Sequence, residues 1–460
     1  MTLLVKGASY LVCAADRIER DCDLLVEGNR IAGVGRYDPQ PGWQVIDAAG
    51  CAVIPGLVNA HTHLYQNFLK GLNDGLTLVD WCDEVLFPAA DVIHAAHRHA
   101  DERLGYAWSL AAALEMIQSG TTCCINMDMS MDAVFQAWLD IGFRGVGAVT
   151  LADRWIPGEI RQSTADLQQQ ALGYVERWHR APADSSPTSS VGLIQVVLAP
   201  TTPFAASPEM LHWVRAQRDR LGLAVQIHVA ETRYEVEEIA QQAGATPLAY
   251  LDRFGLVDER LTAVHCVHMS SEDLDLLRER GVIPVYNPKS NMKLGSGVAP
   301  VAEMLRRGIP VALGTDGSAS NDLLDMFEEM RAGALLQKVA AGDPSVISAT
   351  DVFRMATENG ARACRIDAGT LDPGRLADLV LVDLGGVHLQ PVHDIVNSLV
   401  YCAKGSDVDT VVIDGQIVMQ GRKLLTMDEG AILDLAREWG QNLRQRSQRS
   451  SLYRPAKSTD

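Results

Sequence analysis

One feature limits the fold more than any other: apolar runs of β-strand character alternate with longer stretches of helical periodicity from about residue 58 to 370. The strand candidates lie at 57–61, 121–126, 145–151, 193–199, 224–229, 262–267, 282–286 and 310–314. Helical stretches between them include 97–118, 208–221, 234–242 and 271–280. Eight strands alternating with helices predict an α/β fold, a parallel (β/α)8 TIM barrel.

The two ends of the chain differ from this middle part, since both contain short strands and tight turns. Residues 1–57 contain a predicted hairpin with Gly28-Asn29 at its bend, and the β-rich segments 377–383 and 410–419 follow the barrel, the latter with the turn pair Asp414-Gly415. We expect one small β-sandwich built from 1–57 and 371–425, with the barrel at 58–370 inserted between. Residues 426–460 are expected to form a C-terminal helix and a polar tail, disordered or contacting another subunit from 446, and residues 181–190 a surface loop.

Composition narrows the class of partner. The chain of 460 residues is 47% hydrophobic and carries a formal net charge of -18, which disfavours binding to nucleic acid or to an anionic membrane. Nine scattered cysteines without a Cys-x-x-Cys pair argue against a disulfide framework and a thiolate zinc site, and favour the reducing cytoplasm. The chain begins without the pattern of a signal peptide and contains no apolar stretch long enough to span a bilayer, so no membrane partner is expected.

Polar side chains gather at the ends of the predicted strands. His61 and His63 end the first strand and, being two residues apart, point to the same side of it. His228 ends the fifth strand, His265 lies in the sixth, and Asp316 ends the eighth. The carboxyl ends of barrel strands form one face, so imidazoles and a carboxylate converge there, as suits zinc or another divalent transition metal.

Each of these residues also has an ordinary interpretation. His61 alone fits a hydrogen-bonded core residue, and Asp316 alone fits a helix N-cap. Their joint position at one end of the barrel favours the metal. The fourth strand ends in residues 198–202 without lysine or carboxylate, so a bridging ligand for a second ion is missing and one metal is expected.

Two further residues are candidates for moving protons. Water bound by such a metal has a pKa near 7, and its attack on a ring carbon requires a proton shuttle. Glu231 lies three residues after His228, past the strand end, where it can serve as that shuttle; the alternative is a solvated loop carboxylate beside Thr232-Arg233. His265 is expected to orient the water or polarise the substrate, or else to be a metal ligand.

Five stretches of the sequence are recognisable together: 55–63, His228-x-x-Glu231, 265–268, the Asn-Pro-Lys-Ser-Asn segment 287–300 and 314–321. With the segment 374–380, they resemble the amidohydrolase superfamily over nearly the whole chain. The most similar branch holds the methylthioadenosine/S-adenosylhomocysteine deaminases and the triazine hydrolases. The motifs are specific to the superfamily and much less specific to a substrate.

The resemblance implies a single zinc ion, with iron as the alternative, held by His61, His63, His228 and Asp316. It implies that Glu231, His265 and Asp316 manage protons, and that water displaces ammonia or another leaving group from an electron-poor N-heteroaromatic ring. A homo-oligomer is implied by the resemblance alone.

Departures from the family pattern bear on the substrate. The turn after the fourth strand is Thr201-Thr202-Pro203-Phe204, without the histidine expected for nucleoside deaminases. Residues 89–90 are alanines where a ribose-binding glutamate is expected, and the third strand ends without the expected arginine, although Arg154 is near. These losses favour a compact ring of the free purine, pterin or triazine type. The predicted substrate contacts are Gln66, Trp81, Arg154, Thr202, Phe204 and Ser320.

Three hypotheses follow. The first is a metal-dependent aminohydrolase that deaminates an amino-substituted N-heteroaromatic ring. The second is a triazine-type hydrolase that releases chloride or an alkylamine by the same chemistry. The third is a barrel used only for binding or as a scaffold, which the loss of a metal ligand would support; none of the expected ligands is missing.

Overall fold

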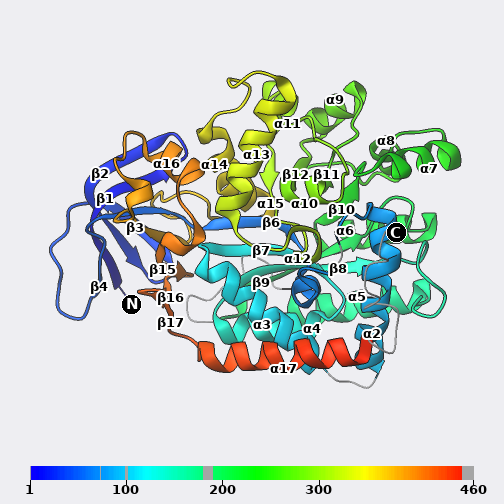
Figure 1. Ribbon diagram of the computed structural model, residues 1–460, viewed down its shortest axis with the longest axis horizontal. Helices are drawn as coiled ribbons and strands as arrows, with labels where there is room; N and C mark the ends of the chain where they lie inside the picture. The colour runs from blue at the N-terminus through cyan, green and yellow to red at the C-terminus, as the bar shows by residue number, and fades with distance from the viewer. Residues whose placement is uncertain (1, 73, 99–101, 180–189, 448–460) are drawn as a thin grey trace, which may run out of the picture.

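The computed structural model describes residues 2–72, 74–98, 102–179 and 190–447, and its larger part is a parallel barrel (Figure 1). The eight strands follow one another around it in sequence order. They are β6 (Leu57–Thr62), β7 (Thr121–Asp128), β8 (Arg144–Leu151), β9 (Ile194–Pro200), β10 (Val225–Val229), β11 (Leu261–His265), β12 (Ile283–Tyr286) and β13 (Ala312–Leu313). The amide of Asp316 donates to the carbonyl of His61 at 3.0 Å, which brings the last strand beside the first. The predicted TIM barrel is confirmed.

The helices that follow the strands begin and end at the expected kinds of residue. Ser207 caps α6 and Ser270 caps α9, each accepting a backbone N–H with its side chain. Gly222 and Gly281 end the same two helices in the left-handed conformation that glycine adopts without strain. The predicted ranges 208–221 and 271–280 therefore match α6 and α9.

The helices around the barrel are α3 (Arg103–Gln118), α4 (Met131–Ile141), α5 (Thr164–Trp178), α6 (Pro208–Leu221), α7 (Arg233–Ala243), α8 (Pro247–Arg253), α9 (Ser271–Arg280), α10 (Pro288–Lys293), α11 (Val301–Arg306), α12 (Ser318–Asn321), α13 (Met326–Ala341), α14 (Ala349–Ala356) and α15 (Glu358–Cys364). Between β6 and α3 lie η1 (Leu64–Leu69), α1 (Leu78–Trp81), η2 (Cys82–Leu86) and α2 (Phe87–Arg98); η4 (Ser190–Leu193) precedes β9. The predicted helix 97–118 was wrong in its start, because this stretch holds the end of α2 and then α3.

The two ends of the chain form one nine-stranded mixed sheet beside the barrel (Figure 1). Its strand order is β17-β16-β15-β14-β5-β1-β2-β3, and β4 pairs with β1. The strands are β1 (Thr2–Ala14), β2 (Arg17–Glu27), β3 (Arg30–Gly35), β4 (Gln44–Asp47), β5 (Cys51–Pro55), β14 (Leu379–Asp383), β15 (Val408–Ile413), β16 (Gln416–Gln420) and β17 (Lys423–Leu424). The sheet buries its own apolar cluster, which includes Leu11 and Leu379. The prediction of a small β domain built from both termini is confirmed, and its strands form one mixed sheet where a β-sandwich was expected.

Both turns predicted from the sequence are present in this sheet. Glu27 pairs with Arg30 across Gly28-Asn29, and Ile413 pairs with Gln416 across Asp414-Gly415. We propose 1–57 with 371–425 and 58–370 as the two domains. The segments η5 (Val387–Leu389), α16 (Ile395–Tyr401) and η6 (Gly405–Asp407) connect β14 to β15, and α17 (Glu429–Ser447) lies along α3 (Figure 1).

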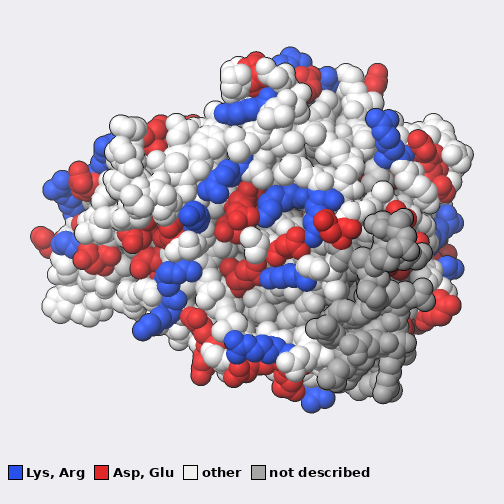
Figure 2. Space-filling view, viewed as in Figure 1, with Lys and Arg blue, Asp and Glu red and all other residues white. Residues whose placement is uncertain are grey.

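Two further predictions concern residues at the limit of the described chain. Of the predicted loop 181–190 only Ser190 is described, and the predicted tail lies outside the described residues from 448 on. No helix among the described residues is both long and apolar enough to cross a membrane. Basic and acidic side chains are interspersed on the face that Figure 2 shows, without a large area of one sign.

Candidate functional site

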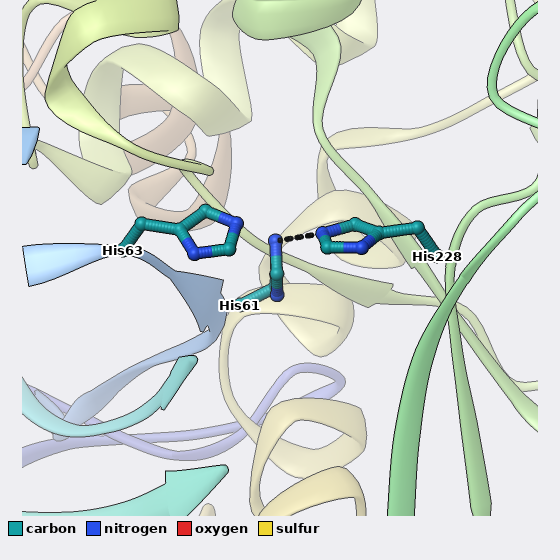
Figure 3. A group of neighbouring side chains, drawn as sticks. All are labelled: His61, His63 and His228. Atoms are coloured by element: carbon teal, nitrogen blue, oxygen red, sulfur yellow. Dashed lines mark hydrogen bonds between the residues drawn. The ribbon is translucent and has the colours of Figure 1, made fainter. Parts of the chain in front are cut away.

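The carboxyl ends of the barrel strands bring the predicted histidines and the aspartate together. His61 lies within β6, His63 follows that strand, and His228 lies in β10 on the opposite side of the barrel (Figure 3). The Nε2 atoms of His61 and His228 are 3.2 Å apart. Oδ1 of Asp316 lies 3.3 Å from Nε2 of His61 and 3.4 Å from Nε2 of His63. The candidate ligand atoms of His61, His63 and His228 all lie within 4.8 Å of one another.

The outer nitrogen of each of these three imidazoles faces a hydrogen-bond acceptor. Nδ1 of His63 donates to the carbonyl of Met127 at 2.7 Å, and Nδ1 of His228 donates to that of Thr201 at 2.6 Å. Nδ1 of His61 faces Oε1 of Gln226 at 3.0 Å, and the Gln226 amide is oriented by donating its own N–H to the carbonyl of Ala60. All three Nε2 atoms are therefore left with lone pairs directed inward, as metal-binding histidines require.

This donor set fits a metal ion. Two lone pairs facing each other at 3.2 Å, in His61 and His228, repel unless a cation lies between or beside them. Burial lowers the pKa of His63 to about 4 and that of His228 well below its ordinary value, so both imidazoles are neutral at pH 7. Three imidazoles and one carboxylate make a set that suits zinc.

His265 differs from the other three in its hydrogen bonds. It ends β11 with a positive φ of 72°, and its Nδ1 faces the amide nitrogens of Asn291 at 2.9 Å and Asn287 at 3.3 Å. Because those groups are donors, Nδ1 accepts and the proton lies on Nε2, which points to Oε2 of Glu231 at 3.4 Å. Its Nε2 also belongs to a close group with His61 and Asp316. Of the two roles left open by the sequence, this tautomer favours the proton donor over the ligand.

Asp316 is held in an unusual backbone conformation, with a φ of 61°. Its Oδ2 accepts hydrogen bonds from the hydroxyls of Ser290 at 2.6 Å and Ser320 at 3.0 Å, which leaves Oδ1 free to face the histidines. Burial opposes its ionisation, but the surrounding imidazoles of His61, His63 and His265 outweigh burial and hold the pKa of Asp316 well below its usual range. The carboxylate is therefore charged and ready to bind a cation.

The glycines around Asp316 are required by close packing. A Cβ on Gly314 would lie 2.6 Å from Oδ1 of Asn287 and 2.9 Å from the amide nitrogen of His61, and a Cβ on Gly317 would collide with the Gln66 side chain. Both contacts lie where the last strand meets the first. The Gly-Thr-Asp-Gly run thus places Asp316 against His61.

Glu231 is a buried residue, only 5% exposed, and not a solvated loop carboxylate. Its Oε1 accepts a hydrogen bond from the Ser296 hydroxyl at 3.1 Å. Burial, and next the negative charges of Asp316 and Glu235, raise its pKa well above the ordinary value. A carboxyl group with a raised pKa beside a metal-binding set can both accept and return a proton near neutral pH.

A mostly apolar cavity of about 190 Å³ opens onto this centre. Five of the six predicted substrate contacts line it: Gln66, Trp81, Thr202, Phe204 and Ser320. Arg154 is exposed and is not among the lining residues, whereas the next residue, Trp155, which has a φ of 53°, lines the cavity.

Sequence reasoning did not single out three residues that position the centre: Gln226, Asn291 and Ser296. Gln226 could have been found, since it lies two residues before His228 and so faces the same side of β10. Asn291 and Ser296 lie in the Asn-Pro-Lys-Ser-Asn segment, whose part in the site comes from its fold across β11.

Comparisons with known proteins show to which family the chain belongs. The model of the family described as "Amidohydrolase family" matches residues 52–418. The chain is 41% identical over 436 residues to a 5'-deoxyadenosine deaminase of Methanothermobacter thermautotrophicus, covering 95% of this chain and 97% of that one. It is 39% identical over 449 residues to a 5-methylthioadenosine/S-adenosylhomocysteine deaminase of Desulforudis audaxviator, covering 96% and 99%.

Solved structures show the same fold. An adenosine deaminase from Xanthomonas campestris with bound zinc superimposes with a TM-score of 0.87 at 32% identity, covering 96% of this chain and 98% of that one. The atrazine chlorohydrolase of Arthrobacter aurescens, complexed with zinc, superimposes with a TM-score of 0.88 at 24% identity, covering 95% and 100%, and at that identity the likeness shows the fold alone.

Proposed function

The chain belongs to the amidohydrolase family, and from this premise we propose that it is a zinc-dependent aminohydrolase that deaminates an amino-substituted N-heteroaromatic ring. One observation carries the proposal: three imidazole lone pairs and one carboxylate oxygen converge at the floor of an apolar cavity, next to a buried carboxyl group. The relatives named above are deaminases of adenine nucleosides, which supports this type of reaction.

The proposed metal ligands are His61, His63, His228 and Asp316. A zinc ion held by these residues would supply Lewis acidity that makes a water molecule nucleophilic near pH 7. The backbone carbonyls behind His63 and His228, and Gln226 behind His61, orient the rings for this task.

The proposed proton route uses Glu231 and His265. Glu231 takes a proton from the attacking water and delivers it to a ring nitrogen, so that the carbon under attack becomes more electrophilic. When the carbon–nitrogen bond breaks, the second proton of that water passes to the amino group, which leaves as ammonia while the ring carbonyl forms. His265 directs its Nε2 proton toward the same space and stabilises negative charge that develops there. Asp316 is the remaining group able to accept a proton from the water.

The walls of the cavity suit a flat ring. Phe87, Trp155 and Phe204 contribute aromatic faces, and Gln66 and Thr202 contribute amide and hydroxyl groups. A neutral heterocycle can stack between such walls and present one edge to the centre. A barrel used only as a scaffold has no need of this arrangement.

The test is ammonia release by zinc-loaded protein from a panel of amines: adenosine, 5'-deoxyadenosine, guanine, a pterin, cytosine and melamine, with a chlorotriazine read for chloride. We expect ammonia from at least one amine and loss of that activity in His61→Asn, which removes a ligand. Protein that retains one zinc ion per chain but releases ammonia from no amine would overturn the proposal, and chloride alone would support the triazine-type alternative.

We also propose that the protein resides in the reducing cytoplasm and forms a homo-oligomer. All nine cysteines are free thiols, eight of them buried or partly buried, and Cys402 is exposed. A free surface thiol is stable in a reducing compartment. Sedimentation of the purified protein measures the oligomeric state directly.

A further inference from the structure

The cavity does not end at the metal centre. It continues over the end of β8 to the inner side of α5, where Ile160, Leu167, Gln170 and Tyr174 line it. Leu167 and Tyr174 are buried, and the Gln170 amide donates to the Tyr174 hydroxyl at 3.2 Å. We call these four residues the α5 subsite. The function proposed above, which acts on one edge of a ring, does not use it.

An aromatic cluster forms part of the cavity wall. The Trp155 ring lies 5.6 Å from that of Phe87 and 5.0 Å from that of Phe204, and Phe204 lies 5.8 Å from Tyr234. These four rings come from four separate segments of the chain. An aromatic wall offers a charged group no hydrogen bonds in place of water, so a charge packed against it would lose part of its hydration.

Two carboxylates that line the cavity outside the metal centre already accept backbone hydrogen bonds. Asp128 accepts N–H groups from Tyr65, Met129 and Ser130, and Glu235 accepts those of Ala230 and Glu231. Both carboxylates therefore hold neighbouring backbone segments in place.

Basic groups are also missing from the walls. Among the described residues that line the cavity there is no lysine or arginine. Arg154 is exposed, and Arg161 donates to the carbonyl of Ile156. An anionic or zwitterionic substituent would thus find no counter-ion, whereas an apolar one would find Leu167, Ile160 and aromatic rings.

We propose that the α5 subsite is a specificity site that accepts an uncharged, apolar substituent of the deaminated ring and rejects a charged one. The inference rests on the proposed aminohydrolase function and names its substrate class. Burying an uncompensated charge in such a space costs enough free energy to lower kcat/KM roughly tenfold or more.

The first test compares substrates that share a ring and differ in the tail. One pair is 5'-methylthioadenosine and S-adenosylhomocysteine, which carry a methyl group or a zwitterionic chain on the same sulfur. A second pair without ribose is 9-butyladenine and 9-(3-carboxypropyl)adenine. We expect kcat/KM for the uncharged member to exceed that of its partner by roughly tenfold or more. A ratio near one in every pair that reacts would overturn the inference.

The two proposals fail in different ways. If no amine releases ammonia, the proposed function is wrong. The same pairs are then compared by calorimetric binding to the zinc-loaded protein, where equal affinities for the charged and uncharged members would also overturn the specificity site.

The second test adds a counter-ion. Gln170→Arg places a cation in the subsite and should lower the preference for the uncharged tail by roughly tenfold, through a lower KM for the carboxylate-bearing member. Gln169→Arg is the matched control, because Gln169 is the exposed neighbour on α5 and is not among the lining residues. If both variants change the ratio equally, the effect is one of net charge and the subsite is not where the tail binds.

Discussion

Two groups of buried charged and polar side chains lie at opposite ends of the barrel. They differ in how many of their charges and hydrogen-bonding groups find partners within the protein. At the amino-terminal end, Arg144 donates to Asp378 at 2.7 and 3.2 Å, to Asp414 at 2.7 Å and to the carbonyl of Gly192 at 3.2 Å. At the carboxyl end, His61 and His228 direct lone pairs at each other, and the carboxylate of Asp316 faces them.

The difference separates stability from function. The Arg144 cluster joins β8 to the strands of the terminal sheet, and each charge is matched within the protein. At the metal centre, the charge of Asp316 and the inward lone pairs of the histidines are matched only when a cation is added. A barrel of this kind places stabilising groups at one end and reactive groups at the other.

The strongest test of this contrast is Glu231→Gln. The substitution removes the proton shuttle and keeps the shape of the side chain, so turnover should fall by roughly 10²–10⁴ while zinc content and melting temperature change little. Glu237→Gln, at an exposed position on α7, is the control and should behave as the wild type. Turnover of Glu231→Gln within a factor of a few of wild type would remove Glu231 from the mechanism.

Substitution of Arg144, at the amino-terminal end of the barrel, should change the stability of the protein. Arg144→Met leaves Asp378 as a buried, unpaired carboxylate, and we expect the free energy of unfolding to fall by about 3–5 kcal/mol, measured by denaturant titration. Arg437→Met, which removes an exposed ion pair with Asp434, should change it by less than about 1 kcal/mol. Turnover per folded molecule is expected to stay near wild type in both variants; a selective loss of turnover in Arg144→Met would contradict the separation.

Acid should destabilise the metal-free protein through its histidines. The pKa of His63 is about 4 in the folded chain, against an ordinary value of 6.5, because burial disfavours the charged form. Between these values the unfolded chain binds more protons, so the stability due to this group is complete above pH 6.5 and is lost as pH falls toward 4, by about 3 kcal/mol at most. Glu231, whose pKa is raised, acts in the opposite sense, since its contribution weakens as pH rises.

This pH dependence can be measured from melting temperatures of chelator-treated protein between about pH 4 and 7. His63→Asn should flatten the curve in the acid part of this range. An unchanged slope in the variant would show that the acid sensitivity comes from another group.

The smallest expected effect concerns Gln226, which orients the proposed metal ligand His61. Gln226→Leu removes the acceptor at Nδ1 of His61 and frees that ring to change tautomer, so zinc affinity should fall roughly 10–100-fold in competition with a chelator dye. Gln195→Leu, at a half-buried position on the neighbouring strand β9, is the comparison for the loss of a strand amide. Unchanged zinc affinity in Gln226→Leu would mean that the backbone of β6 alone orients His61.

Much of the site could be predicted because strands impose a simple geometry. His61 and His63 share one face of a strand end, and the ends of parallel strands meet at one edge. The structure accordingly brings His228, Asp316 and Glu231 to the same place. Their roles as ligands and proton carriers stay predictions until the experiments above are done.

The positioning residues could not be predicted in this way. Asn291 reaches His265 from another segment at 2.9 Å, and Ser290 reaches Asp316 at 2.6 Å, through the fold of a loop whose course no periodicity describes. Arg154 was expected in the cavity, but its neighbour Trp155 lines the cavity instead, and local sequence pattern does not distinguish the two.

The sequence by itself determined the order of strands and helices, the union of both termini in one sheet and the set of residues at the strand ends, because local periodicity and turn chemistry act over a few residues. Only the tertiary structure decided which nitrogen of each histidine is free, which carboxylates are already engaged, and how far the cavity extends toward α5. These properties depend on hydrogen bonds and packing between segments far apart in the chain, and it is they that decide which substrate the centre can accept.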